Sequence, residues 1–80
     1  MDLTADRAIS LRHLALANGH VAKGFRRVER QAALIAKLER DGHDTVQANG
    51  LLEQLETTLA LQIEHRDRIL QELGGRTGIY

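Results

Sequence analysis

The 80-residue sequence predicts an all-α fold, an antiparallel helical hairpin of two long helices. Apolar residues recur at helical spacing in two long stretches, one short glycine-containing joint separates the stretches, and proline is absent. The absence of cysteine excludes disulfides, and the scarcity of aromatic residues disfavours β-sandwiches and barrels. A chain this short buries only a small core, so we expect a second copy to complete a four-helix bundle.

The first helix is expected over about residues 4–41, which at ~1.5 Å per residue spans roughly 55 Å. Thr4 suits the N-cap position, and Lys37 and Arg40 complement the negative C-terminal end of the helix dipole. The Asn18-Gly19 step is a point where this helix could kink. Its predicted seam, meaning the apolar stripe that faces other helices, comprises Leu14, Val21, Phe25, Val28, Ile35 and Leu38, with Leu11 and Ala32 in the same stripe.

The second helix is expected over about residues 45–73, and residues 74–80 are expected to form a mobile tail after paired glycines. Its predicted seam, interrupted at Arg66, comprises Leu52, Leu55, Leu59, Ile63 and Leu70, with Ala48 and Leu73 in the same stripe. Further apolar residues lie off both seams, namely Leu16, Leu34, Leu51, Leu61 and Ile69. They widen the apolar surface and favour a homodimer of hairpins.

The joint between the helices is predicted to be a tight turn at residues 42–44. Gly42 suits the left-handed conformation that often follows the last turn of a helix. Asp44 is expected to cap the second helix, and Gln47 lies three residues later, as in a capping box. So short a connection directs the second helix back along the first, which predicts the antiparallel arrangement.

The charges balance overall but differ between the two halves of the chain. Residues 1–42 carry eight basic and five acidic residues, whereas residues 43–80 carry three basic and six acidic residues. This asymmetry favours pairing of the two helices, although an exposed ion pair contributes only ~0–1 kcal/mol. Zero net charge disfavours a dedicated nucleic-acid or membrane-surface protein, and with no apolar run long enough to cross a membrane we expect a cytoplasmic location.

The densest basic run is KGFRRVER, residues 23–30. On a helix, Lys23, Arg27 and Arg30 share one flank and could contact phosphate groups or a protein partner. They could equally pair with Glu53 and Glu56, which the hairpin brings to about the same height. Nucleic-acid binding is therefore the less favoured reading of this run.

The hairpin tip is a second candidate for partner contact, through Asp41 and His43. The spacing Asp41-x-x-Asp44-x-Val46 resembles the acidic coiled-coil tips of the DksA and Gre transcription factors, which enter the secondary channel of bacterial RNA polymerase. The resemblance covers about six residues, and Val46 stands where the DksA pattern has alanine. These 80 residues include no counterpart of the globular anchoring domain of those proteins, and helix capping accounts for Asp44 without a partner.

Chemistry-bearing residues are sparse, so we predict no catalytic, cofactor-binding or metal site and no enzymatic activity. His13 and His20 lie two helical turns apart, and neither His43 nor His65 has a companion histidine at ligand spacing. Ser10 is the single serine, and no phosphate-cradling glycine loop is present. Histidines contributed by two chains remain an alternative for a metal-responsive bundle.

From about residue 13 to residue 73, the chain is similar to a group of short helical-hairpin proteins from rhizobial-type alphaproteobacteria, to which no function is assigned. The residues that carry this similarity are His20-Val21, Gln31, Leu34-Ile35, Leu38, Gly42-His43-Asp44-Thr45, Ala48, Leu51-Leu52, Leu59 and Arg66-Asp67. The resemblance implies a free-standing helical hairpin and transfers no catalytic or binding residues.

These observations predict a small cytoplasmic protein–protein interaction or regulatory module that acts as a homodimeric helical bundle with a further, unidentified protein partner. The alternative is a binder of nucleic acid or of the transcription machinery that uses the basic stripe at residues 23–30 or the acidic tip.

Overall fold

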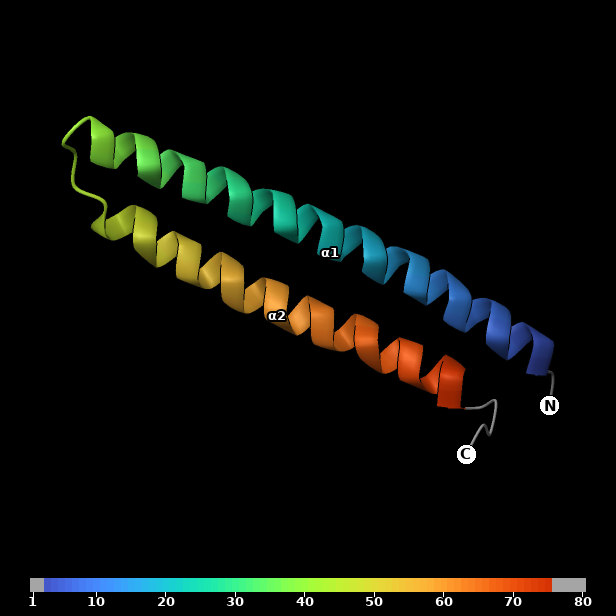
Figure 1. Cartoon of the computed structure of the whole chain (residues 1–80). Coiled ribbons are helices and arrows are strands. Elements are labelled where there is room, and N and C mark those ends of the chain that lie inside the picture. Colours follow the sequence, from blue (N-terminus) through green and yellow to red (C-terminus); the bar gives the residue numbers. More distant parts are fainter. Residues whose placement is uncertain (1–2, 76–80) are drawn as a thin grey trace.

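The computed structural model describes residues 3–75, which form two α-helices packed side by side (Figure 1). Helix α1 spans Leu3–Arg40 and helix α2 spans Val46–Gly75. They form a hairpin of 61 × 23 × 15 Å, and the N-terminal end of α1 extends past the end of α2 (Figure 1). The all-helical fold with two packed helices is thus confirmed for the described residues.

The helices begin and end within one or two residues of the predicted positions. Thr4 lies inside α1 and not at its N-cap, because the helix already begins at Leu3. At the other end, Gly74 and Gly75 are still helical, so α2 extends two residues beyond the predicted end at residue 73. Residues 76–80 of the predicted mobile tail lie outside the described residues.

Helix α1 ends in a Schellman motif centred on Gly42. The Gly42 amide N–H donates to the Glu39 carbonyl oxygen at 3.1 Å, and the His43 amide N–H donates to the Leu38 carbonyl oxygen at 2.9 Å. Gly42 has a φ of +75°, the left-handed conformation that this motif requires and that a side chain disfavours. The chain can therefore reverse direction directly after the last turn of α1.

Asp44 satisfies a backbone donor at the start of α2, as an N-terminal cap does. Its Oδ1 atom accepts a hydrogen bond from the Val46 amide N–H at 2.9 Å. The expected reciprocal bond from Gln47 is not among the hydrogen bonds of the described residues. The Asn49 side-chain amide donates to Thr45 Oγ1 at 3.1 Å, a contact between two side chains that satisfies no backbone group.

The residues between the helices follow an unbroken alternation of three- and four-residue steps. In α1 the buried and half-buried positions are Ser10, Leu14, Ala17, Val21, Gly24, Val28, Gln31, Ile35 and Leu38. In α2 the matching positions are Ala48, Leu52, Leu55, Leu59, Gln62, Arg66, Ile69 and Leu73, with Ile63 half-buried beside them. This spacing keeps one stripe of each helix facing the other, from Ser10 to Leu38 in α1 and from Ala48 to Leu73 in α2.

Two predicted seam residues lie outside this contact. Phe25 is 48% exposed and Leu70 is 45% exposed, while their neighbours Gly24 and Ile69 are buried. The same holds for Leu11 and Ala32, whose places in the seam are taken by Ser10 and Gln31. Residues three and four positions after a seam residue both lie near the same face of a helix. The prediction takes the more apolar of the two at each step, and this places part of the predicted stripe to one side of the observed seam.

Small and polar residues set the spacing of the helices near the middle of the seam. A Cβ atom at Gly24 would lie 2.8 Å from Gln62 Oε1 and 2.9 Å from Leu59 Cδ1, so α2 fills the space that a side chain would take. Closer to the turn, Gln31 Nε2 donates to the Ala48 carbonyl oxygen across the helix pair at 3.0 Å. These contacts set the register in which the two helices meet.

Candidate interaction surfaces

The hairpin presents a different surface on each side of the seam. In α1 one flank of the seam includes Asn18 and Phe25, which directly follow the seam residues Ala17 and Gly24. The other flank includes His20 and Arg27, which directly precede the seam residues Val21 and Val28. In an antiparallel pair, matching flanks of the two helices lie on the same side. The residues around the groove described below confirm this assignment, because they join one flank of α1 to the matching flank of α2.

The first surface, which we call the alanine face, is apolar and acidic. Its apolar residues are Ala8, Leu11, Ala15, Ala22, Phe25, Ala32 and Ala36 of α1 with Val46, Ala60, Ile63 and Leu70 of α2, all exposed except the half-buried Ile63. Its charged residues are Glu29, Glu39, Glu53, Glu56 and Asp67, with no lysine or arginine among the described residues on this face. Alanines let a second helix approach closely, so this face suits helix packing.

The second surface, the histidine face, is mixed and mainly basic. It consists of Ile9, His13, Leu16, His20 and Leu34 of α1 with Leu51, Thr58, Leu61 and His65 of α2. Its cations are Lys23, Arg27, Arg30, Lys37 and Arg68, against the anions Asp6 and Glu72. The large apolar residues of this face are therefore separated by charged and histidine side chains.

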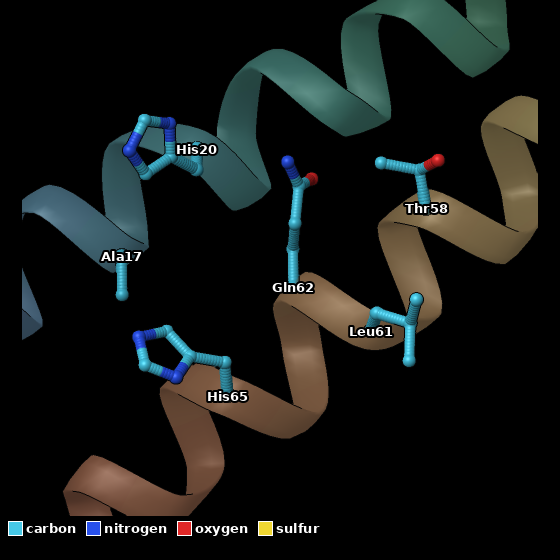
Figure 2. Close-up of a pocket in the computed structure, with 6 residues that line it drawn as sticks. All are labelled: Ala17, His20, Thr58, Leu61, Gln62 and His65. Carbon is cyan, nitrogen blue, oxygen red and sulfur yellow. The ribbon is translucent and has the colours of Figure 1, made fainter.

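A groove of about 330 Å³ lies in the histidine face, with Ala17 and His20 on α1 and Thr58, Leu61, Gln62 and His65 on α2 (Figure 2). Ala17, with its small side chain, lines this space beside the seam. Gln62 reaches from α2 toward α1, and its buried Oε1 atom has no hydrogen-bond partner. An unpaired buried acceptor of this kind destabilises a fold by about 1–3 kcal/mol.

Two of the histidines share the groove, and a third lies far from it. His20 and His65 line the same groove from opposite helices (Figure 2), whereas His43 lies at the tip of the hairpin. Within residues 3–75 no group of three histidine, aspartate or glutamate side chains is arranged to hold a metal ion. The groove thus offers two imidazoles from one chain and no complete ligand set.

The basic stripe of Lys23, Arg27 and Arg30 lies on the histidine face and is exposed. Its proposed partners Glu53 and Glu56 lie on the alanine face, so the alternative of ion pairs between these groups is wrong. The two groups lie at about the same height along the hairpin, but they cannot form ion pairs because their flanks are on opposite sides of the seam. The ion pairs of the described residues are instead local to α2, joining Arg66 to Asp67 at 3.0 Å and Arg68 to Glu64 at 3.2 Å.

At the tip, Asp41 and His43 are exposed, and their side chains make no hydrogen bond or ion pair within the described residues. The backbone N–H groups of both residues are used in ending α1, while Asp44 caps α2. The tip therefore presents one carboxylate and one imidazole to the surroundings on a hydrogen-bonded turn.

The seam contains residues that were missed by a search for large apolar side chains. Ala17 and Gly24 are buried although they are small, Gln31 is buried although it is polar, and Ile69 was placed off the seam. Strict alternation of three- and four-residue steps from Leu14 to Leu38 would have found the first three residues. That signal depends on position and not on residue type.

No family model, curated protein or solved structure matches the chain. The resemblance to rhizobial-type hairpin proteins and to acidic coiled-coil tips therefore stays a prediction from the sequence. Neither described helix contains a segment long and apolar enough to cross a membrane.

Proposed function

We propose that the chain is a protein–protein interaction or regulatory module that acts in the cytoplasm as a homodimeric, coiled-coil-type four-helix bundle. The observation that carries this proposal is excess surface. The hairpin exposes 6299 Å², whereas a compact monomer of 8.9 kDa exposes about 4,800 Å². Its radius of gyration is likewise 18.1 Å, against about 12 Å for a compact chain of this length.

The interior of the hairpin supports the same proposal. Within the described residues no large side chain is fully buried, and the large apolar side chains of both faces, apart from the half-buried Ile63, are 45–72% exposed. Covering such surface contributes about 25 cal/mol per Å², so packing against another helical surface is strongly favoured. A second copy is the partner that is always present at the concentration of the chain itself.

Sedimentation equilibrium of the full chain, combined with circular dichroism, tests this proposal. We expect a species of twice the chain mass at micromolar concentration, with a thermal midpoint that rises as protein concentration rises. A fully helical monomer with a concentration-independent midpoint up to millimolar concentration would contradict it.

The second candidate is a binder of nucleic acid or of the transcription machinery. Lys23, Arg27 and Arg30 favour it, because they are exposed on one flank and the acidic residues of α2 do not neutralise them by ion pairing. If these three residues contact the phosphates of duplex DNA, the logarithm of the binding constant should fall with the logarithm of salt concentration with a slope of about −3. Binding that is insensitive to salt would exclude phosphate contacts by this stripe.

A further inference from the structure

The alanine face changes character along the length of the hairpin. Contacts across the seam show which residues of the two helices lie at the same height. Gln31 contacts Ala48, Gly24 lies against Leu59 and Gln62, and Ala17 packs with Ile69. This register places Glu53 and Glu56 near the height of Glu29 on the half next to the turn. The alanine face thus has an acidic half at the turn.

The half of the alanine face next to the open end is almost free of charge. The same register brings Ile63 near the height of Phe25 and Leu70 near the height of Ala15, with Leu11 beyond them. The one charged residue of this half, Asp67, already accepts two contacts from Arg66, with Nη2 at 3.0 Å and Nε at 3.1 Å. Near the N-terminal end, α1 carries the exposed cations Arg7 and Arg12, which border the alanine face on either side.

We infer that the alanine face is the surface across which two copies of this chain pack, in antiparallel orientation, with the apolar open-end halves in contact. This inference rests on the proposed homodimer and adds to it the face and the direction. A two-fold axis across the middle of the apolar half, near Asn18, brings the acidic turn half of each copy beside the basic N-terminal end of the other.

Charge decides between the two possible directions. In a parallel dimer, Glu29, Glu53 and Glu56 of both copies would lie together, and like charges in contact destabilise an interface. In the antiparallel dimer the same carboxylates lie near Arg7 and Arg12 of the second copy. Asn18 then lies near the axis, where its two copies can hydrogen-bond to each other and hold the register.

The available area is sufficient for a specific dimer. Half of the 61 Å length across the 23 Å width gives about 700 Å² per copy, close to the ~800 Å² that a standard interface buries on each partner. The histidine face is less suitable, because an isologous contact centred on its basic stripe would bring Lys23, Arg27 and Arg30 of both copies together. Its large apolar residues are also interrupted by His13, His20 and His65.

Single-cysteine spin labelling of the full chain tests the direction, since the chain contains no native cysteine. Gly19→Cys labels the predicted centre, where a side chain meets nothing within 4 Å, and Ala33→Cys labels an exposed site nearer the turn. We expect a distance of about 20–30 Å between the Gly19 labels and about 45–50 Å between the Ala33 labels, from a rise of 1.5 Å per residue. Short distances at both positions would overturn the antiparallel arrangement.

Two glutamate substitutions test the face. Phe25→Glu on the alanine face should raise the dimer dissociation constant at least ~100-fold, whereas Leu16→Glu on the histidine face should change it less than ~3-fold. Phe25 is 48% exposed and Leu16 is 59% exposed in the single hairpin, so the two variants are matched for their effect on the isolated fold. Loss of the dimer only with Leu16→Glu would overturn the choice of face.

A charge exchange separates complementarity from general destabilisation. Arg7→Glu together with Arg12→Glu should weaken the dimer about tenfold, and adding Glu53→Arg and Glu56→Arg to the same chain should restore it. No restoration would contradict the antiparallel pairing. A wild-type chain that is monomeric contradicts the proposed function itself, whereas a dimer with short distances at both labels contradicts only this inference.

Discussion

Helix α1 carries two apolar stripes along its length, and α2 covers only one of them. The covered stripe, the seam, includes Gly24 and the polar Gln31, while the uncovered alanine face includes Phe25 and Leu11. If hydrophobicity alone chose the packed surface, the phenylalanine would be inside and the glutamine outside. The covered stripe is therefore selected by how well the two helices fit together, which depends on the turn and on close approach at small residues.

The largest expected difference in stability is between two leucines of α2, one in the seam and one outside it. Leu59 is 7% exposed and Leu61 is 62% exposed. Leu59→Ala should lower the free energy of unfolding by about 2–5 kcal/mol, because it leaves a cavity between the helices. Leu61→Ala should lower it by less than ~0.5 kcal/mol. Urea denaturation followed by circular dichroism at low protein concentration measures both, and equal losses would contradict the described seam.

The turn is expected to matter next, since it determines which stripe of α2 returns to α1. Gly42→Ala should lower the free energy of unfolding by about 1–2 kcal/mol, because a Cβ atom is strained at a φ of +75°. Space is not the cause, as a side chain there would meet nothing within 4 Å. Gly42→Asn is the matched control and should lose less, since asparagine tolerates the left-handed conformation. Equal losses in the two variants would argue against backbone strain.

A smaller effect is expected from the cap of α2. Asp44→Ala removes the acceptor for the Val46 amide N–H and should lower the free energy of unfolding by ~1 kcal/mol. Asp41→Ala, three residues earlier and without a side-chain partner in the described structure, is the control and should have little effect. Thermal unfolding of the two variants distinguishes them, and a larger loss for Asp41→Ala would show that the tip carboxylate has a contact that the hairpin alone lacks.

The smallest expected change in stability comes from substituting two glycines of α1, one outside the seam and one inside it. Gly19→Ala should raise the free energy of unfolding by about 0.8–1.0 kcal/mol, because alanine favours the helix and its Cβ meets nothing within 4 Å. Gly24→Ala should give no such gain, because its Cβ would displace Gln62 and Leu59. An equal gain at both positions, measured by urea denaturation, would show that the helices do not approach closely at Gly24.

Local sequence patterns are sufficient to predict the two helices, their approximate ends and the reversal between them. These features depend on interactions within a few residues, such as the left-handed Gly42 and the cap at Asp44, and local patterns report them directly. The tertiary structure alone decided which flank of each helix is covered. Phe25 or Gly24, and Leu70 or Ile69, are equally near the apolar face of an isolated helix, and only contact with the other helix separates them.

The candidate surfaces show the same division. The sequence identifies Lys23, Arg27 and Arg30 as one basic flank, but their separation from Glu53 and Glu56 follows only from how the flanks are arranged about the seam. The two faces, one apolar and acidic and the other basic and rich in histidine, likewise exist only once α2 is placed beside α1. Their physical origin is that helical spacing determines the neighbours of a residue on its own helix, while the register between helices determines its neighbours across the molecule.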